Sequence, residues 1–186
     1  TATHSAAWEL TAVPPSMIVI GGGATGAQVA SIFNAFGSRI KLFQSGPRIL
    51  PTEDEEISAA VTAAFRESGI EVRENFGSIE SFERTPDGVR MFFTKDGRRE
   101  ETEAALAVIA IGWAANTADL SLESVSVETD GRDFVRVDEF LRTSAPHVFA
   151  AGDVTGRMML VPQAIQEAFV AATNAVRGAT MKALEG

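Results

Sequence analysis

The sequence contains no cysteine and no tyrosine, and its only two histidines are His4 and His147. Without cysteine, the chain can form no disulfide, no thiolate metal site and no cysteine nucleophile. The absence of tyrosine excludes a short-chain dehydrogenase, because that class needs a catalytic tyrosine. The two histidines are too far apart for the spacing of local metal ligands, so we expect no metal site. No serine lies in a G-x-S-x-G elbow, which argues against a hydrolase.

Positive charge and long apolar runs are also scarce. Lysine and arginine number 16 against 25 aspartates and glutamates, which gives a net charge of −9. A chain this acidic, with no basic cluster, is a poor partner for nucleic acid or for an anionic membrane. The longest apolar run, 104–111, is far too short to span a bilayer. Because the chain starts at Thr1 with no signal-like segment, we expect a piece excised from a cytoplasmic protein.

The first half of the chain alternates strand and helix signals. Residues 1–16 carry little pattern, and we interpret them as a connector. Residues 17–20 are wholly apolar, which is typical of a strand buried on both faces. A glycine-rich turn follows, and then apolar residues at helical spacing up to Gly37. Residues 39–43 alternate charged and apolar side chains and predict a second strand.

A second helix is predicted after Pro51. Thr52 and Glu55 fit a Thr-x-x-Glu capping box, and acidic residues favour the positive end of a helix dipole. We therefore interpret the acidic run 53–56 as helix capping and not as a metal or catalytic cluster. The expected apolar face of this helix consists of Ile57, Ala60, Val61, Ala64 and Phe65.

The middle of the chain predicts a small antiparallel sheet. After a strand at 70–72, the segments 77–84, 89–94 and 98–103 are separated by turn tripeptides ending in Asp-Gly. Another buried strand is expected at 104–111. The predicted fold class is therefore α/β: a Rossmann-like parallel sheet that carries an antiparallel β-meander flap.

The remainder of the chain is less complete. Brief strands are expected at 134–137 and 148–151, and a helix with proline in its first turn at 162–176. Two short strands and one helix cannot form a core alone. We therefore expect an incomplete second segment that belongs to a larger domain.

The turn after the first buried strand has the pattern G-x-G-x-x-G. It runs Gly21, Gly22, Gly23, Ala24, Thr25, Gly26. Gly21 allows a tight turn, Gly23 lets a pyrophosphate approach the backbone, and Gly26 lets helix and strand pack closely. The free N–H groups at the helix N-terminus would bind the anion. The alternative is a glycine-rich turn between strand and helix that binds no ligand.

The end of the second strand carries Gln44 where dinucleotide-binding proteins often have an acidic residue. A carboxylate there would hold the adenosine ribose hydroxyls and repel a 2′-phosphate, whereas an arginine would accept that phosphate. Glutamine can hydrogen-bond either group. Arg48 could reach a phosphate, or it could be a solvated loop charge. The choice between NAD and NADP stays open, with a slight lean to NAD from Gly26.

An ordered set of motifs resembles one family. The set consists of the glycine turn after Pro14-Pro15-Ser16, Ala110-Ile111-Gly112, Asn116-Thr117, Val137-Asp138, Leu141-Arg142-Thr143-Ser144, Pro146-His147 and 148–156 (Val-Phe-Ala-Ala-Gly-Asp-Val-Thr-Gly). In this order the motifs are similar to those of the pyridine nucleotide-disulfide oxidoreductases, a family of flavoproteins. The resemblance covers nearly the whole chain from Pro14 to Gly178.

The resemblance implies a division of the chain and a set of binding residues. Residues 17–115 would be an NAD(P)H-binding domain, closed by Gly112, and 116–186 the returning C-terminal part of an FAD-binding domain. Asp153 matches the aspartate that binds the ribityl and phosphate region of the flavin. Gln163 and Ala164 match the start of a helix whose dipole faces the flavin pyrimidine ring. In the intact parent, hydride would pass from nicotinamide to flavin.

The departures from the family pattern matter as well. The N-terminal flavin-binding glycine loop, the redox cysteine pair and the C-terminal dimerisation domain are not in this sequence. Gln28 replaces a common glutamate, Ala24 a common aromatic residue, and Trp113 a common basic residue. We expect a fragment that binds NAD(P)H, does not retain FAD, has no catalytic residue and is inactive alone.

A second hypothesis comes from a different class. The fragment would be a non-catalytic Rossmann-type interaction module with an empty glycine loop. Its partner would be the missing remainder of the parent flavoprotein, or a second copy bound through the exposed surface of 134–178. Nucleotide titration separates the two hypotheses.

Overall fold

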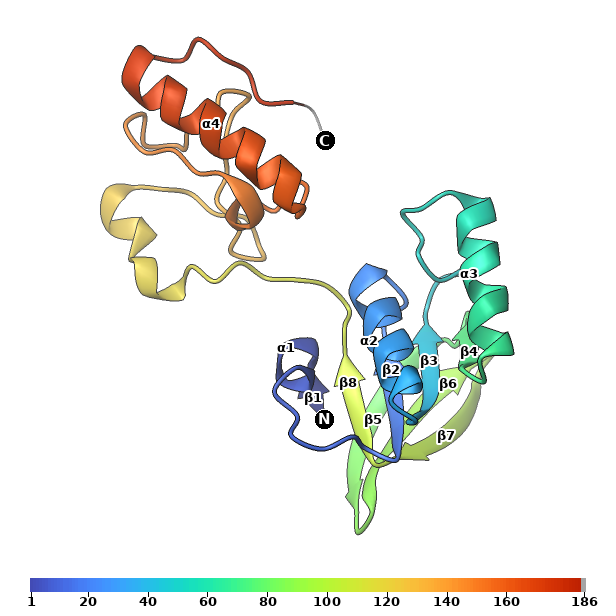
Figure 1. Ribbon diagram of the computed structural model, residues 1–186. Helices are drawn as coiled ribbons and strands as arrows, with labels where there is room; N and C mark the ends of the chain where they lie inside the picture. The colour runs from blue at the N-terminus through green and yellow to red at the C-terminus, as the bar shows by residue number, and fades with distance from the viewer. Residues whose placement is uncertain (185–186) are drawn as a thin grey trace. The chain divides into compact units, whose positions relative to one another are not determined.

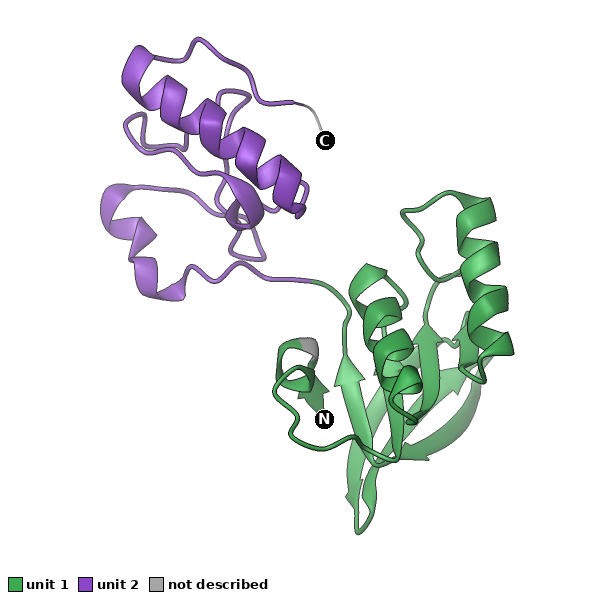
Figure 2. Cartoon of the chain, in the orientation of Figure 1, with its two compact units in different colours: residues 1–112 green, residues 113–186 purple. Residues whose placement is uncertain are grey.

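A computed structural model describes residues 1–184 and divides the chain into two compact units. Unit 1 comprises 1–112 and unit 2 comprises 113–186 (Figure 2). The last two residues of the expected flavin-domain segment, 185 and 186, lie outside the described residues.

Unit 1 is built on a five-stranded, wholly parallel sheet. Its strands are β1 (Ala2–Thr3), β2 (Ser16–Ile20), β3 (Arg39–Gln44), β4 (Glu71–Glu74) and β8 (Leu106–Ile109), in the order β1-β8-β2-β3-β4. The helices of the unit are α1 (His4–Ala7), α2 (Ala24–Ala35) and α3 (Glu55–Glu67). The crossovers through α2 and α3 join neighbouring parallel strands, as in dinucleotide-binding folds, whereas β8 lies between β1 and β2.

A three-stranded antiparallel sheet, the meander, packs against one face of the parallel sheet. It consists of β5 (Ser78–Thr85), β6 (Gly88–Lys95) and β7 (Arg98–Ala104), in the order β5-β6-β7. Helices α2 and α3 lie on one face of the parallel sheet and the meander lies on the opposite face (Figure 1). The predicted fold class, a Rossmann-like parallel sheet with an antiparallel meander, is confirmed.

Strand β2 is buried on both of its faces, by helices on one side and by the meander on the other. Met17 and Val19 pack among helix residues, whereas Ile18 and Ile20 pack among meander residues. All four side chains are at most 2% exposed. The prediction of a strand buried on both faces is therefore confirmed, and its continuous apolar sequence is explained by the two cores.

The core between the two sheets contains a cluster of three phenylalanines. The ring centroids of Phe43, Phe76 and Phe93 lie 5.3–5.9 Å apart in edge-to-face arrangements. This geometry is favourable for aromatic quadrupoles and adds to the burial of the rings. The cluster joins β3 to β6 and so fixes the meander onto the parallel sheet.

Truncation of this cluster is expected to destabilise unit 1. Phe93→Ala removes a ring that is fully buried and leaves a cavity in its place. The free energy of unfolding should therefore fall by about 3–5 kcal/mol. Urea unfolding would measure this change. Phe36→Ala removes a ring that is 64% exposed and should cost under about 1 kcal/mol. Equal losses in both variants would contradict the assignment of this core.

Three local predictions in unit 1 are wrong. The expected connector 1–16 contains β1, which pairs with β8, and α1; a two-residue strand is too short to give a sequence period. The N-cap of α3 is Asp54, whose side chain accepts from the Glu56 amide, so Thr52 forms no capping box. The run expected as one strand at 104–111 is divided between the end of β7 and β8.

The buried face of α3 also differs from the prediction. Ile57 is exposed, whereas Ser58 and Thr62 are buried. The Ser58 hydroxyl donates to the Ile49 carbonyl at 2.6 Å. A small hydroxyl therefore takes the place of an apolar side chain, because α3 packs close to the loop that precedes it.

Unit 2 has little regular structure. It contains the short 3₁₀ turns η1 (Ala118–Leu120), η2 (Leu122–Val125) and η3 (Gly152–Thr155), and the helix α4 (Val161–Arg177). The expected strands at 134–137 and 148–151 are absent from the described residues, where only the isolated bridges Thr129–Val135 and Arg142–Phe149 occur. Alternating sequence alone does not make a strand, because a ladder needs a neighbouring strand over several residues. The predicted helix is confirmed.

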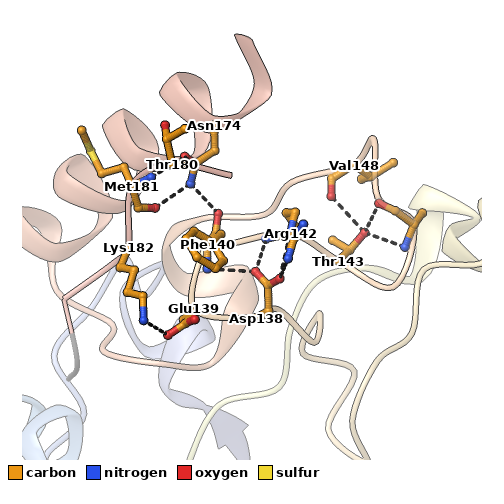
Figure 3. Close-up of polar contacts among 11 residues, drawn as sticks. Asp138, Glu139, Phe140, Arg142, Thr143, Val148, Asn174, Thr180, Met181 and Lys182 are labelled. Carbon is orange, nitrogen blue, oxygen red and sulfur yellow. Dashed lines mark hydrogen bonds and ion pairs between the residues drawn. The ribbon is translucent and has the colours of Figure 1, made fainter. Parts of the chain in front are cut away.

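Side-chain hydrogen bonds hold unit 2 together where strands do not (Figure 3). The buried Asn174 amide donates to the carbonyls of Phe140 and Met181 and accepts from the amides of Thr180 and Met181, at 2.7–3.0 Å. The end of α4 and the following segment are thereby fixed to the 138–142 turn.

Burial alone would raise the pKa of Asp138, but hydrogen bonds from the Arg142 amide and guanidinium and from the Phe140 amide hold that pKa below its ordinary value.

No helix within residues 1–184 combines the length and the apolar character that a membrane crossing requires.

Candidate functional site

The glycine turn lies at the carboxyl edge of the parallel sheet. From β2 the sheet extends through β3 and β4 on one side and through β8 and β1 on the other. The chain adds β3 and β4 on one side of β2 and later returns to place β8 on the other side, so the strand order reverses between β2 and β8. In open parallel sheets, ligands bind outside the carboxyl ends of the strands at such a switch point.

Two glycines of the turn are required by contacts within the protein. Gly21 has φ +102°, and a Cβ placed on it would lie 2.3 Å from the Ala110 carbonyl oxygen. A Cβ on Gly26 would lie 1.7 Å from the Gly21 carbonyl oxygen. Since neither position can hold a side chain without backbone movement, these glycines let β2, α2 and the end of β8 approach closely.

Gly23 is different, because no contact within residues 1–184 requires a glycine at this position. A Cβ placed there would have no atom within 4 Å, and its φ of −72° is open to any residue. Gly23 is the N-cap of α2 and provides no side-chain cap; Ala24 and Thr25 begin the first turn. The first N–H groups of a helix lack partners inside the helix and carry partial positive charge. The space beside Gly23 is thus suited to an anion that must come near the backbone.

Gln44 is the last residue of β3 and is bound to the glycine turn. Its side-chain oxygen Oε1 accepts from the Gly22 amide at 2.9 Å. The Gly22 carbonyl in turn accepts from the Leu50 amide at 2.6 Å. Because a backbone N–H fixes the oxygen of Gln44, the side-chain nitrogen Nε2 is the group left for a ligand.

The loop after β3 lies at the same edge of the sheet and is held there by Glu74. The Ile49 amide donates to Glu74 Oε1 at 3.1 Å, and Glu74 Oε2 pairs with Arg66 at 3.1 Å. Arg48 is half-buried: Nη2 donates to the Pro51 carbonyl at 3.1 Å, and Nη1 is covered and has no hydrogen-bond partner within residues 1–184. Arg48 is therefore not the fully solvated charge that one alternative expected.

Gly112 follows β8 at the same edge of the sheet. It has φ +132°, and a Cβ placed on it would meet no atom within 4 Å. Ala110, two residues earlier, borders Gly21 and donates its amide to the Ile20 carbonyl at 2.7 Å. The structure thus brings the whole glycine turn, Gln44 and Gly112 to one edge of unit 1.

The remaining candidate residues lie together in unit 2. Asp153 is an exposed residue of η3, and Gln163 and Ala164 are in the first turn of α4. The preceding residue, Gly152, has φ +74°, and a Cβ placed on it would lie 3.2 Å from the Ala164 Cβ. Helix α4 has no side-chain cap. The exposed Asp153 therefore follows a residue that packs directly against the first turn of α4.

Two glutamates that were not predicted from the sequence support these residues: Glu74 is half-buried and Glu167 is fully buried. Glu74 ends β4, and an acidic residue at the end of a third parallel strand was a usable signal. Glu167 is fully buried in α4, where its carboxylate accepts from the Gly152 amide at 2.7 Å. It lies seven residues before the buried Asn174, so the polar spacing along the helix was visible in the sequence. Within the part of the chain that the structure describes, no cluster of metal-ligating side chains occurs.

Comparison with known proteins agrees with this geometry. Residues 1–168 match the family described as pyridine nucleotide-disulphide oxidoreductase. A dihydrolipoyl dehydrogenase of Thermus scotoductus is 34% identical over 165 residues, 88% of this chain and 36% of the relative. The crystal structure of LpdA from Mycobacterium tuberculosis is 31% identical, with a TM-score of 0.80 over 94% of this chain and 37% of its own.

A third relative was solved with a nucleotide. The water-forming NADH oxidase of Lactobacillus brevis, bound to NADH, has a TM-score of 0.75 at 25% identity, over 96% of this chain and 39% of its own. The chain therefore spans little more than a third of the length of the relatives it matches. Since the family match nevertheless extends over most of its residues, the chain belongs to the pyridine nucleotide-disulphide oxidoreductase family.

Proposed function

We propose that unit 1 binds a nicotinamide dinucleotide, with its pyrophosphate beside Gly23 at the N-terminus of α2. The observation that carries the proposal is the contrast among the glycines. Gly21 and Gly26 are required by protein contacts, whereas a Cβ on Gly23 would have no atom of the described residues within 4 Å. A ligand that needs the backbone exposed explains the third glycine, and the amides of Ala24 and Thr25 supply donors for an anion.

The adenosine end of this site presents a hydrogen-bond donor. With Oε1 of Gln44 bound to Gly22, Nε2 can donate to a ribose hydroxyl or to a 2′-phosphate. Because the side chain of Gln44 is neutral, it does not repel the phosphate. We infer that NADH and NADPH both bind and that discrimination between them is weak. The lean to NAD that Gly26 suggests is then a small preference only.

A single substitution tests this view of the adenosine end. Gln44→Glu keeps an oxygen for the Gly22 amide and adds a charge, so NADPH binding should weaken at least about tenfold while NADH binding is retained. Calorimetric titration of both nucleotides measures the two affinities. Gln28→Glu adds the same charge at an exposed position of α2 and should alter both affinities by the same factor. Unchanged NADPH binding in Gln44→Glu would remove Gln44 from the site.

We propose further that unit 2 contributes part of an FAD site. The exposed Asp153 carboxylate can accept hydrogen bonds from hydroxyls, and the uncapped start of α4 at Gln163 and Ala164 can stabilise negative charge. When bound in the intact protein, FAD would supply the group that accepts hydride from the nicotinamide. The chain's own residues bind and orient; none of them is proposed as a general acid or base.

It follows that the 186-residue chain should bind NAD(P)H but should not retain FAD or turn over a substrate. Titration of the purified chain with NADH and NADPH tests the first statement. Binding of either nucleotide supports the proposal, and binding of neither to a folded sample would contradict it. A visible flavin spectrum after purification would contradict the second statement.

One observation favours the alternative of an interaction module. Helix α4 exposes large apolar side chains along one side: Val161 (74%), Ile165 (67%), Phe169 (64%) and Val176 (85%). Such a stripe is typical of a helix that packs against another element. If nucleotides do not bind while the chain associates through α4, the interaction hypothesis replaces nucleotide binding.

A further inference from the structure

The carboxylate of Glu167 is unusual because it is buried without contacting a proposed ligand. Among the side chains that the structure describes, it is the one charged group that is fully buried, with 0% exposure. Burial of a carboxylate costs free energy that pairing and hydrogen bonding offset only in good geometry. Between residues 113 and 184, unit 2 has only two small clusters of buried apolar residues. A burial this costly in so small a unit calls for a role beyond filling the core.

Glu167 holds both ends of the turn that carries Asp153. One oxygen, Oε2, accepts from the Gly152 amide at 2.7 Å. The other, Oε1, accepts from Arg157 Nε at 3.1 Å and from Gln163 Nε2 at 3.4 Å. Gly152 immediately precedes Asp153, and Arg157 follows η3. The two oxygens therefore bracket η3 and tie it to the first turn of α4.

The contact between η3 and α4 leaves little freedom. A Cβ on Gly152 would lie 3.2 Å from the Ala164 Cβ, so the turn passes directly against the helix. The Thr155 hydroxyl donates back to the Gly152 carbonyl at 2.8 Å. Since η3 is closed on itself, the bond from Gly152 to Glu167 sets the position of the whole turn on the helix.

We propose that Glu167 is a positioning residue for the flavin half-site: by accepting from the Gly152 amide, it fixes the Asp153 carboxylate relative to the N-terminus of α4. The proposal rests on the proposed function for the flavin, which Glu167 itself does not touch. Supporting contacts of this kind hold binding groups within the narrow tolerance that binding needs. The charge of Glu167 pairs with Arg157, but the acceptor for Gly152 is what the placement of Asp153 requires.

Two substitutions separate the acceptor from the charge. Glu167→Gln keeps an oxygen for the Gly152 amide, whereas Glu167→Met keeps a similar volume without an acceptor. Glu139→Gln is the matched control, because it removes a carboxylate of unit 2 that is 55% exposed and pairs with Lys182. Amide hydrogen exchange and residual dipolar couplings of the 186-residue chain measure the local hydrogen bond and the orientation of η3 on α4.

In Glu167→Met, the Gly152 amide should exchange about tenfold to 100-fold faster, because a buried donor loses its partner. The residual dipolar couplings of residues 152–155 should change relative to those of α4 in that variant. The amides of Thr180 and Met181, which Asn174 holds, should keep their protection. Glu167→Gln and Glu139→Gln should resemble the parent chain in all these measurements.

Two results would overturn the positioning role. The first is an unchanged Gly152 amide and unchanged couplings in Glu167→Met. The second is faster exchange at Thr180 and Met181 to the same degree, which would mean that Glu167 only stabilises the unit as a whole.

Addition of FAD gives the functional readout. Chemical shifts of Asp153 and Gln163 should respond to excess FAD in the parent chain and in Glu167→Gln, and at least tenfold more weakly in Glu167→Met. An equal response in Glu167→Met would overturn the proposal. If the parent chain itself does not respond, the flavin part of the proposed function fails, whereas the exchange comparison still decides the role of Glu167.

Discussion

Gly23→Ala is expected to weaken binding of NADH by about tenfold to 100-fold, because a methyl group beside the first amides of α2 keeps the pyrophosphate from its charge-assisted hydrogen bonds. The same variant should lose less than about 1 kcal/mol of folding free energy. A Cβ at this position meets no protein atom, and its backbone suits any residue. Loss of NADH binding without loss of folding stability would therefore indicate that Gly23 is required for ligand binding and not for folding. Calorimetric titration and urea unfolding measure the two quantities.

Gly131→Ala serves as the control for this experiment. Gly131 lies in unit 2 and also has open space around its Cβ position without a positive φ. The substitution should change neither binding nor stability of unit 1. If Gly23→Ala binds NADH as tightly as the parent chain does, the open space at Gly23 has no role in binding, and the proposed pyrophosphate position is wrong.

Gly26→Ala is expected to give the opposite pattern, in which stability and binding are lost together. Its Cβ would lie 1.7 Å from the Gly21 carbonyl oxygen, so α2 or the turn must move. Overpacking of this degree should lower the free energy of unfolding by about 3 kcal/mol or more. A displaced turn no longer presents the amides to an anion, and NADH binding should fall below detection.

The control for Gly26→Ala is Gly37→Ala, at the other end of α2. Gly37 has φ +96° but open space around its Cβ position, so the cost should be about 1–2 kcal/mol of backbone strain. NADH binding should be retained. Wild-type stability in Gly26→Ala would contradict the close approach of α2 to β2 in this structure.

The sequence was sufficient for the central elements of unit 1 because their signals are local and agree with one another. The apolar strand 17–20, the glycine turn and the Asp-Gly turns of the meander each specify their own backbone. The start of α3 was less predictable, since Thr52 and Asp54 are both acceptable caps and only the path of the loop selects Asp54. The contact of Gln44 with Gly22 was also beyond prediction, because it depends on how two loops meet.

The sequence was less informative for unit 2. The segments 134–137 and 148–151 have strand-like composition, but each finds only a single bridging residue within residues 1–184. Helix α4 buries Glu167 and Asn174 while it exposes Ile165 and Phe169. Val170 and Ala171 are buried on α4 as well, so the buried face mixes polar and apolar side chains and cannot be derived from the apolar period alone.

The most direct test of nucleotide binding at the glycine turn is a chemical-shift map of the ¹⁵N-labelled chain during titration with NADH. We predict that the largest changes occur at the amides of Gly22, Gly23, Ala24 and Thr25 and at the side-chain NH₂ of Gln44. Saturation that leaves these signals unchanged, or that shifts only residues of unit 2, would contradict the claim that this turn binds the dinucleotide.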